Sequence, residues 1–316
     1  MPLVPSEAMR ILVTGVSGYV GAALVPRLRR EGHAVRGFAR SAARVNGLGL
    51  ALDDLVIGDA RTGAGLPEAL DEIDVAYYLM HSMEGAAAGA FAVAELAAAD
   101  AFAAAAARAG VRRIVYLGGL LPQGAPLSRH LASRLAVEER LLGAVPEAIA
   151  FRASIVIAAR SRSFRFLVRL VERMPVLALP AWREHRTAPV DGRDLLEFLT
   201  AAATAPARLA RRSWDIGGPD VMTYRAMITR IADAMLVSRP VLAVDVTLTP
   251  VAAVLAAAVA GEDPALIEPL MESLSHDLLP RDGDAAEAFG VRLHPFDRAV
   301  ERALRDWEHD EELAAR

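Results

Sequence analysis

The stretch Arg10-Ile-Leu-Val-Thr-Gly-Val-Ser-Gly-Tyr-Val-Gly-Ala-Ala-Leu24 decides the fold of this chain. Its first five residues, with the apolar Ile-Leu-Val at their centre, predict a short buried strand, and residues 22–30 predict a helix. Between them Gly15, Gly18 and Gly21 permit a tight turn, close approach of the backbone to a pyrophosphate, and packing of the helix on the strand. The order strand, glycine turn, helix therefore predicts a dinucleotide-phosphate site. The alternative is a glycine-rich turn without a ligand.

Composition limits the classes of protein to consider. The chain has 316 residues, a hydrophobic fraction of 54% and a net charge of −4, which suits a substantial core and gives no sign of nucleic-acid binding. It contains no Cys, and all 35 basic residues are Arg, so cysteine and lysine chemistry are excluded within this chain. The N-terminus lacks the pattern of a signal peptide, and the most apolar stretch, 248–261, is too short to span a membrane. We therefore expect a cytoplasmic protein.

The first half of the chain alternates apolar strands with helices. Further strands are predicted at residues 33–40, 54–59, 74–80, 111–118 and 148–157, with long helices at 86–109 and 127–142. This alternation predicts an α/β fold with a doubly wound, Rossmann-type parallel sheet. Beyond residue 158 the pattern loosens. We divide the chain into an NAD(P)-binding core (1–158) and a smaller, mostly helical substrate-binding portion (159–316), with segments near 186–190 and 213–217 completing the sheet.

The ends of the predicted strands indicate which residues contact the cofactor, because ligands lie beyond the carboxyl ends of such strands. The second strand ends without the Asp or Glu that usually binds a free ribose 2′-OH, and Arg36 and Arg40 stand there instead. An arginine fork suits a 2′-phosphate, so NADP(H) is favoured over NAD(H). The alternative is a solvated strand edge. The predicted contacts are Gly15, Ser17, Gly18, Tyr19, Val20, Gly21, Arg40, Ser41, Asp59, Ala60, Leu79, Met80, Leu117 and Gly118.

Two side chains at the ends of strands, and one inside a strand, carry further expectations. Asp59 either accepts a hydrogen bond from the adenine amino group or caps the loop that follows it. His81, just after the fourth strand, is a candidate contact to substrate or nicotinamide. Tyr116 lies inside the fifth strand and is expected to belong to the core.

Five segments resemble the short-chain dehydrogenase/reductase superfamily, and more closely its atypical or extended branch of NmrA-like and epimerase-like NAD(P)H-binding proteins. They lie at residues 13–21, 78–82, 113–119, 151–157 and 214–220. The resemblance implies a Rossmann fold and a nicotinamide cofactor over roughly the first two-thirds of the chain.

Typical members of this superfamily carry a Tyr-x-x-x-Lys pair on the helix after the fifth strand, and this pair is absent here. His130 and Arg134 stand in its place, four residues apart on one helix face. The resemblance implies that Arg134 holds the ribose or a phosphate, and that His130 exchanges a proton with a carbonyl or hydroxyl group. The alternative places His130 in packing or at the surface and pairs Arg134 with Glu138.

Together these patterns predict an NADP(H)-dependent reductase that acts on a carbonyl or conjugated double bond of a small, largely apolar substrate. A regulatory protein that senses NADP without catalysis, and an isomerase or cyclase with no net redox change, are the alternatives. His185 is a weaker substrate candidate, while Asp191 and Asp194 are expected to cap a helix. We expect no metal, nucleic-acid or membrane partner, and a monomer or homodimer with residues 251–260 as a candidate interface.

Overall fold

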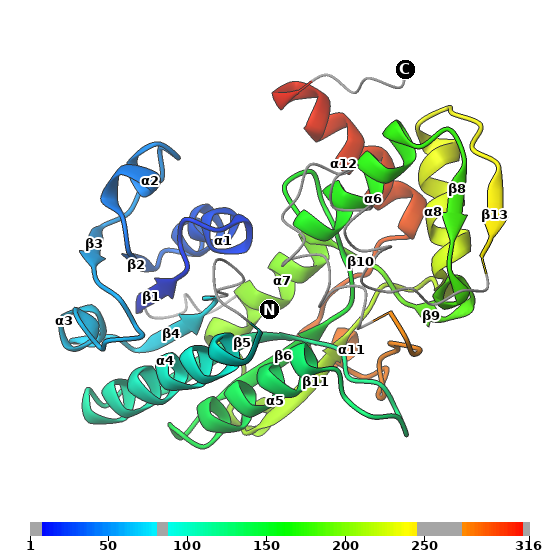
Figure 1. The fold of residues 1–316 in the computed structure, drawn as a ribbon. Coiled ribbons are helices and arrows are strands. Elements are labelled where there is room, and N and C mark those ends of the chain that lie inside the picture. Colours follow the sequence, from blue (N-terminus) through cyan, green and yellow to red (C-terminus); the bar gives the residue numbers. More distant parts are fainter. Residues whose placement is uncertain (1–7, 81–87, 245–273, 312–316) are drawn as a thin grey trace.

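A seven-stranded parallel sheet forms the centre of the molecule (Figure 1). The computed structural model describes residues 8–80, 88–244 and 274–311. The strand order is β11-β6-β5-β4-β1-β2-β3. The strands are β1 (Arg10–Thr14), β2 (Ala34–Ala39), β3 (Asp54–Ile57), β4 (Val75–Tyr78), β5 (Arg113–Gly119), β6 (Ile149–Ala153) and β11 (Arg212–Ile216). The order reverses between β1 and β4, the switch point at which doubly wound sheets bind ligands. The predicted Rossmann-type α/β fold is confirmed.

Helices cover both faces of the sheet (Figure 1). Side chains alternate along each strand, so Ile11 and Val13 join one apolar cluster and Leu12 joins the opposite one. One face packs against α1 and α7, and the other packs against α3, α4 and α5. The helices are α1 (Tyr19–Arg30), α2 (Ala42–Asn46), α3 (Leu66–Leu70), α4 (Ala88–Arg108), α5 (Arg129–Leu142) and α7 (Gly192–Thr204).

The sixth predicted strand, 148–157, is divided in two. Beyond β6 the chain leaves the sheet, and β7 (Val156–Ile157) pairs with β10 (Val190–Asp191). The Ser154 N–H donates to the Ile216 carbonyl at 3.0 Å, while the Ile155 carbonyl accepts from Val190 at 2.9 Å. Neighbouring backbone groups therefore bond to different elements, which bends the strand.

The segment 186–190 does not complete the main sheet, so that prediction is wrong. Its first part, β9 (Arg186–Thr187), pairs instead with β12 (Met222–Thr223) in a separate two-stranded sheet. The segment 213–217 does complete the main sheet, because β11 runs parallel to β6 at its edge.

A second apolar core fills the C-terminal portion of the molecule. It is enclosed by α6 (Arg162–Arg173), α8 (Tyr224–Ala234) and α12 (Phe296–Asp310), with β8 (Leu177–Leu179), η1 (Ala181–Glu184) and β13 (Val241–Ala243) beside them. By contrast, α7, β11 and α11 (Ala285–Phe289) contribute to the core on the sheet, although they follow residue 158.

Two expectations fall on segments that lie outside the described residues. These are the role of His81 and the candidate interface at residues 251–260. Among the helices of the described part, none combines the length and the apolar character that crossing a membrane requires.

Candidate cofactor and substrate site

The glycine turn between β1 and α1 is closely packed on its inner side. Gly15 has a φ of +63°. A Cβ atom on Gly15 would lie 2.7 Å from the Leu79 carbonyl oxygen, and one on Gly21 would lie 2.5 Å from the Gly15 carbonyl oxygen. Larger residues are therefore excluded at both positions. Ser17 and Gly18 are exposed just before α1 begins, so the N–H groups at this helix end can reach a phosphate.

Thr14 joins the glycine turn to the end of β4. Its hydroxyl donates to the Tyr77 carbonyl at 2.8 Å and accepts from the Leu79 N–H at 3.1 Å. The Met80 nitrogen lies 3.2 Å from the position of a Cβ on Gly15. The structure thus brings the predicted contacts at the ends of β1 and β4 together at the switch point of the sheet.

The predicted arginine fork at the end of β2 does not form. Arg36 Nε lies 2.8 Å from Asp54 Oδ2, and its guanidinium also donates to the carbonyl groups of residues 68, 69 and 71. Arg36 thus fastens β2 to β3 and to the end of α3, and its assignment to a 2′-phosphate is wrong. Arg40 is exposed at the end of β2, and Ser41 follows it as the N-cap of α2.

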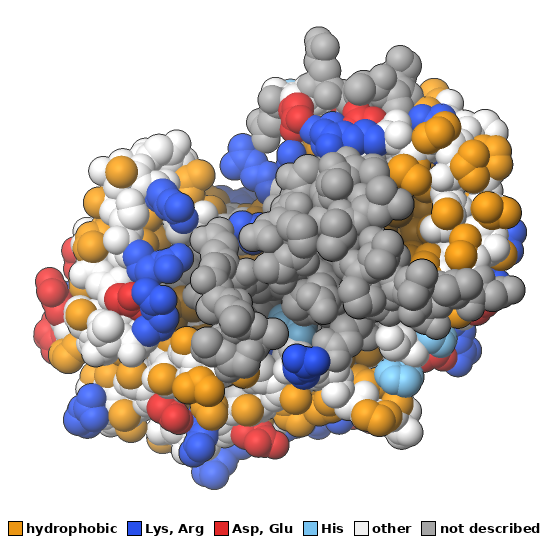
Figure 2. Space-filling model, in the orientation of Figure 1, with side chains coloured by type: hydrophobic (Ala, Val, Ile, Leu, Met, Phe, Trp, Pro, Cys, Tyr) orange, Lys and Arg blue, Asp and Glu red, His pale blue; other side chains and the backbone are white. Residues whose placement is uncertain are grey.

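The surface beside this strand end is rich in arginine. Arg40, Arg44 and Arg61 are all exposed there. Figure 2 shows blue side chains gathered over the region of β2 and α2, next to a hollow in this face of the molecule. This position is accessible to an anionic ligand group.

Asp59 caps the loop after β3. Its Oδ1 accepts from the Arg61 N–H at 2.9 Å, and its carboxylate forms an ion pair with the Arg61 guanidinium at 2.7 Å. The side-chain hydrogen bonds from Arg61 hold the pKa of Asp59 below its usual value, with a smaller contribution from Arg40. The structure supports the capping role, while contact with adenine stays a prediction. Ala60 is buried in the core between the sheet and α3.

Arg134 lies buried at the end of β5 with protein partners. Its guanidinium is 3.4 Å from Glu95 of α4, donates to the Leu117 carbonyl, and lies 5.0 Å from the centre of the Tyr116 ring. Ser133 donates to the same Glu95 carboxylate at 2.6 Å. Arg134 therefore ties α4, α5 and the end of β5 together, and Glu95 offsets much of its charge.

Glu138, the partner that the sequence suggested for Arg134, serves another cation. Its carboxylate accepts a bifurcated hydrogen bond from Arg152 Nε, at 3.1 and 2.9 Å, and a second hydrogen bond from Nη2 at 2.6 Å. Both side chains are buried. In place of the Arg134–Glu138 pair that the sequence suggested, Arg134 pairs with Glu95 and Arg152 pairs with Glu138.

His130 lies half-buried in the first turn of α5, one turn before Arg134. Tyr116, in the neighbouring strand, is almost fully buried, and its hydroxyl donates to the Arg134 carbonyl at 3.1 Å. Burial raises the pKa of Tyr116 to about 12, with Arg134 opposing the rise. Tyr116 is therefore a core residue, as its position in the strand predicted, and the proton-transfer role of His130 stays a prediction.

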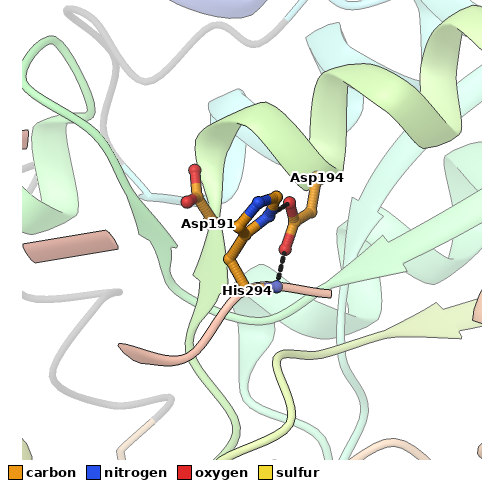
Figure 3. Close-up of side chains that lie close together, drawn as sticks. All are labelled: Asp191, Asp194 and His294. Atoms are coloured by element: carbon orange, nitrogen blue, oxygen red, sulfur yellow. Dashed lines mark hydrogen bonds and ion pairs between the residues drawn. The ribbon is translucent and has the colours of Figure 1, made fainter. Parts of the chain in front are cut away.

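A polar cluster that no sequence spacing indicated lies at the start of α7 (Figure 3). Asp191 caps the helix by accepting from the Arg193 N–H at 2.8 Å. Asp194, in contrast to its predicted capping role, accepts from His294, at 2.7 Å from the backbone nitrogen and 2.6 Å from Nδ1. Ligand atoms of Asp191, Asp194 and His294 lie within 4.8 Å of one another. Arg302 already neutralises Asp191 at 2.6 Å.

This cluster touches the glycine turn through Tyr19. A Cβ atom on Gly192 would lie 2.4 Å from the Tyr19 hydroxyl oxygen, so the phenol fits between α1 and α7 only because residue 192 is glycine. Burial, with a contribution from Asp191, raises the pKa of Tyr19 to about 12. The side chain of Tyr19 thus packs against α7, and its predicted cofactor contact would involve its backbone.

His185, the weaker substrate candidate, is held within the C-terminal portion. Its Nδ1 lies 2.7 Å from the Leu274 carbonyl, and its ring stacks on His276 with 6.3 Å between centres. These contacts give His185 a structural role and leave its contact with substrate a prediction.

Comparison with known proteins places this geometry in context. Residues 11–130 match the NAD dependent epimerase/dehydratase family. A search of curated proteins found no match to the chain.

Solved structures share the whole fold. UDP-glucuronic acid 4-epimerase from Bacillus cereus, in complex with NAD, is 15% identical with a TM-score of 0.71, covering 96% of this chain and 99% of its own. A dTDP-glucose 4,6-dehydratase double mutant from Streptomyces venezuelae, with NAD bound, is 18% identical with a TM-score of 0.70, covering 96% and 97%. A short-chain dehydrogenase/reductase superfamily protein from Agrobacterium tumefaciens, with bound NAD, is 18% identical with a TM-score of 0.69, covering 95% and 98%. The segment with the glycine turn therefore matches the NAD-dependent epimerase/dehydratase family, and the predicted resemblance to the epimerase-like branch of the short-chain dehydrogenases/reductases is confirmed.

Proposed function

We propose that the protein is an enzyme that binds a nicotinamide dinucleotide across the ends of β1, β4 and β5 and acts on a small, largely apolar substrate. The glycine turn carries this proposal. Its inner side has no room for a Cβ atom at Gly15 or Gly21, while Ser17 and Gly18 leave the start of α1 open to a phosphate. The family match over residues 11–130 supports the same cofactor class.

We further propose NADP(H) as the preferred cofactor. The three neighbours described above were solved with NAD, which favours the unphosphorylated form. In this chain, however, no acidic residue stands at the end of β2, and the exposed Arg40 lies there beside the Ser41 cap. A guanidinium at this position suits a 2′-phosphate.

The bound cofactor would supply hydride chemistry, and the chain would supply positioning and a proton. Arg134 holds the Leu117 carbonyl at the end of β5, where the family places the nicotinamide ribose. His130, one helical turn away, is the proposed proton donor to a carbonyl or conjugated double bond. A second candidate, an isomerisation or elimination with no net redox change, is favoured by the match to epimerases and dehydratases.

Cofactor binding and turnover can be measured separately. Titration of the protein with NADPH, followed by nucleotide fluorescence, tests binding. Loss of reduced-nicotinamide absorbance across a panel of aldehydes, ketones and enones tests reduction in the wild type and in His130→Ala. Tight binding with no turnover in either protein would reject the reductase and favour the sensor, whereas product without loss of NADPH would favour the second candidate.

The cofactor preference predicts a selective effect of Arg40→Ala. NADP affinity should fall by roughly 1–3 kcal/mol, the range for a hydrogen bond to a charged group, while NAD affinity stays unchanged. Calorimetric titration with both nucleotides measures the difference. Arg36→Ala is the matched control, because Arg36 is bound to Asp54 and should affect both affinities alike. An equal loss for both nucleotides in Arg40→Ala would show that the arginine does not read the phosphate.

A further inference from the structure

Asp191 is a buried carboxylate that two parts of the chain share. Its side chain is only 3% exposed. The Oδ1 atom accepts from the Arg193 N–H at 2.8 Å and so caps α7. The Oδ2 atom accepts from Arg302 Nη1 of α12 at 2.6 Å, whereas Arg193 Nη2 lies farther away, at 3.5 Å. Both oxygens of the carboxylate are therefore engaged, and Arg302 is the closer of these two cations.

Arg302 reaches this carboxylate from the C-terminal portion of the molecule. Its helix, α12, contributes apolar side chains to the second core, namely Phe296, Ala299, Val300, Ala303, Leu304 and Trp307. The same helix packs against β7 and against β10, the strand that ends in Asp191. The Arg302 side chain is 25% exposed, so most of it lies within this contact. A cation from the C-terminal core thus neutralises the cap of a helix that packs on the main sheet.

Tyr19 links Asp191 to the glycine turn. The Tyr19 hydroxyl lies against Gly192, the residue after Asp191, because a Cβ atom there would be 2.4 Å from the phenol oxygen. Burial is the largest cause of the raised pKa of Tyr19, the charge of Asp191 comes next, and Asp306 of α12 adds to the rise. Tyr19 is the first residue of α1. The charge of Asp191 therefore stands close to the helix end that would face the phosphates of the proposed cofactor.

A carboxylate in this position needs a cation for two physical reasons. A buried charge that loses its partner is strongly unfavourable, so an unpaired Asp191 would rearrange toward water. The phenol of Tyr19 would then lose the surface against which it packs. An unneutralised carboxylate would also repel phosphate groups at the start of α1, because like charges repel strongly where water screens them little.

We propose that Arg302 is a positioning residue of the cofactor site. By neutralising Asp191, it keeps Tyr19 and the first turn of α1 in place and keeps the electric field there favourable to a phosphate. The role in dinucleotide binding rests on the proposed function, whereas the fastening of α1 does not. The start of α1 thus depends on α12, and the cofactor site is complete only when the C-terminal core is packed against the sheet.

The first test follows amide hydrogen exchange in the protein without nucleotide. The Ala22 N–H, bonded across the first turn of α1 at 2.9 Å, reports on the cofactor end of that helix. The His33 N–H, bonded to the last turn of α1 at 3.2 Å, reports on the far end. Arg302→Met should speed exchange at Ala22 at least about tenfold and leave His33 unchanged, a factor that corresponds to 1.4 kcal/mol.

Arg298→Met is the matched control. Arg298 lies one turn earlier on α12, its side chain is 73% exposed, and its partner is the exposed Glu301. This variant should change exchange at neither amide. Unchanged exchange at Ala22 in Arg302→Met, or equal acceleration at Ala22 and His33, would overturn the proposal.

Two rescue variants separate the charge of Arg302 from its packing. Arg302→Lys keeps the cation, and Asp191→Asn/Arg302→Met removes both charges while an amide oxygen still caps α7. Both variants should return exchange at Ala22 to the wild-type rate, even if Arg302→Met alone does not fold. A double variant as labile as Arg302→Met would overturn the proposal, because the unpaired carboxylate would then not be the cause.

The second test is nucleotide affinity, measured by calorimetric titration with NADPH. The affinity should fall roughly tenfold in Arg302→Met, stay at the wild-type value in Arg298→Met, and recover in both rescue variants. A wild-type affinity in Arg302→Met would overturn the positioning role.

The two proposals fail in distinguishable ways, because exchange at Ala22 requires no nucleotide. Exchange that depends on Arg302, in a protein that binds no nicotinamide nucleotide, supports the fastening of α1 and rejects the proposed cofactor. Tight NADPH binding that is unaffected by Arg302→Met supports the cofactor and rejects the positioning role.

Discussion

At the scale of single residues, Gly192 connects the polar cluster of Asp191, Asp194 and His294 to the glycine turn. It begins α7 directly after the Asp191 cap, and the Tyr19 hydroxyl occupies the space in which a side chain would stand. Because Tyr19 is the first residue of α1, its position helps to set the direction of the helix end that would face the proposed cofactor. A methyl group on residue 192 would therefore displace the Tyr19 side chain and, through it, disturb the glycine turn before α1.

Gly192→Ala tests this connection. The added Cβ would lie 2.4 Å from the Tyr19 hydroxyl oxygen and 2.8 Å from the Ala158 Cβ. We expect a loss of stability of roughly 1–3 kcal/mol, typical of overpacking, together with weaker nucleotide binding. Denaturant unfolding and nucleotide titration measure the two effects. Gly283→Ala, with open space at its Cβ position, is the control and should change stability by less than about 0.5 kcal/mol.

The Tyr19→Phe background separates the contact from general damage. Removal of the phenol oxygen eliminates the closer of the two clashes, so Gly192→Ala should cost less in this background. An equal cost in both backgrounds would mean that Tyr19 does not transmit the effect.

At the scale of elements, charged side chains hold β2 and β3, at one edge of the sheet, to each other and to α1. Asp53, which precedes β3, accepts from the Val35 N–H of β2 at 2.8 Å and pairs with Arg29 of α1. The backbone hydrogen bond from Val35, followed by the side-chain bond from Arg29, holds the pKa of Asp53 below its usual value. One exposed carboxylate thus joins a helix to two strands in its charged form.

This shift predicts how stability depends on pH. Because folding lowers the pKa of Asp53, its contribution is present above the unfolded value of about 3.9 and is lost as pH falls through the folded value. Asp53→Asn should therefore reduce the free energy of unfolding by about 1 kcal/mol at neutral pH. Urea denaturation at neutral and acidic pH measures this, and the difference between the two proteins should shrink in acid. A difference independent of pH would assign the effect to lost packing.

The periodicity of apolar residues predicted most strands and helices, because it records which residues are buried. It does not record breaks that depend on partners distant in sequence. The strand at residues 10–14 agrees with β1 throughout, because a buried parallel strand needs a continuous apolar run. The run at 148–157 is equally apolar, yet it breaks after Ala153. Its backbone partners there are Ile216 and Val190, which are distant in sequence, so no local pattern records the break.

At the scale of the whole molecule, a buried charge network joins β6 and β11, at one edge of the sheet, to α5 and to the segment before α11. Arg152 of β6 pairs with Glu138 of α5, and Ser213 of β11 donates to the same carboxylate. Two residues further along β11, Asp215 binds Arg281 at 2.8 Å, which anchors the segment before α11. Groups from four parts of the chain must therefore assemble together.

Arg152→Met should be strongly destabilising, because it leaves the Glu138 charge buried without its cation. The expected loss is about 3–5 kcal/mol in the free energy of unfolding, measured by urea denaturation. The double variant Arg152→Met/Glu138→Met removes both charges and should recover part of that loss. A double variant as unstable as the single one would show that packing, and not the unpaired charge, dominates.

The sequence by itself determined the Rossmann-type fold and the glycine turn on which the proposed cofactor site depends, because local periodicity and glycine spacing record these features along the chain. Tertiary structure alone decided the partners of polar side chains. It committed Arg36 to Asp54, gave Arg134 to Glu95, and joined Asp194 to His294 across the fold. Partner choice depends on distances between segments that are remote in sequence. The glycine turn could therefore be found by spacing, whereas the contact between Asp194 and His294 appeared only once every neighbour was in place.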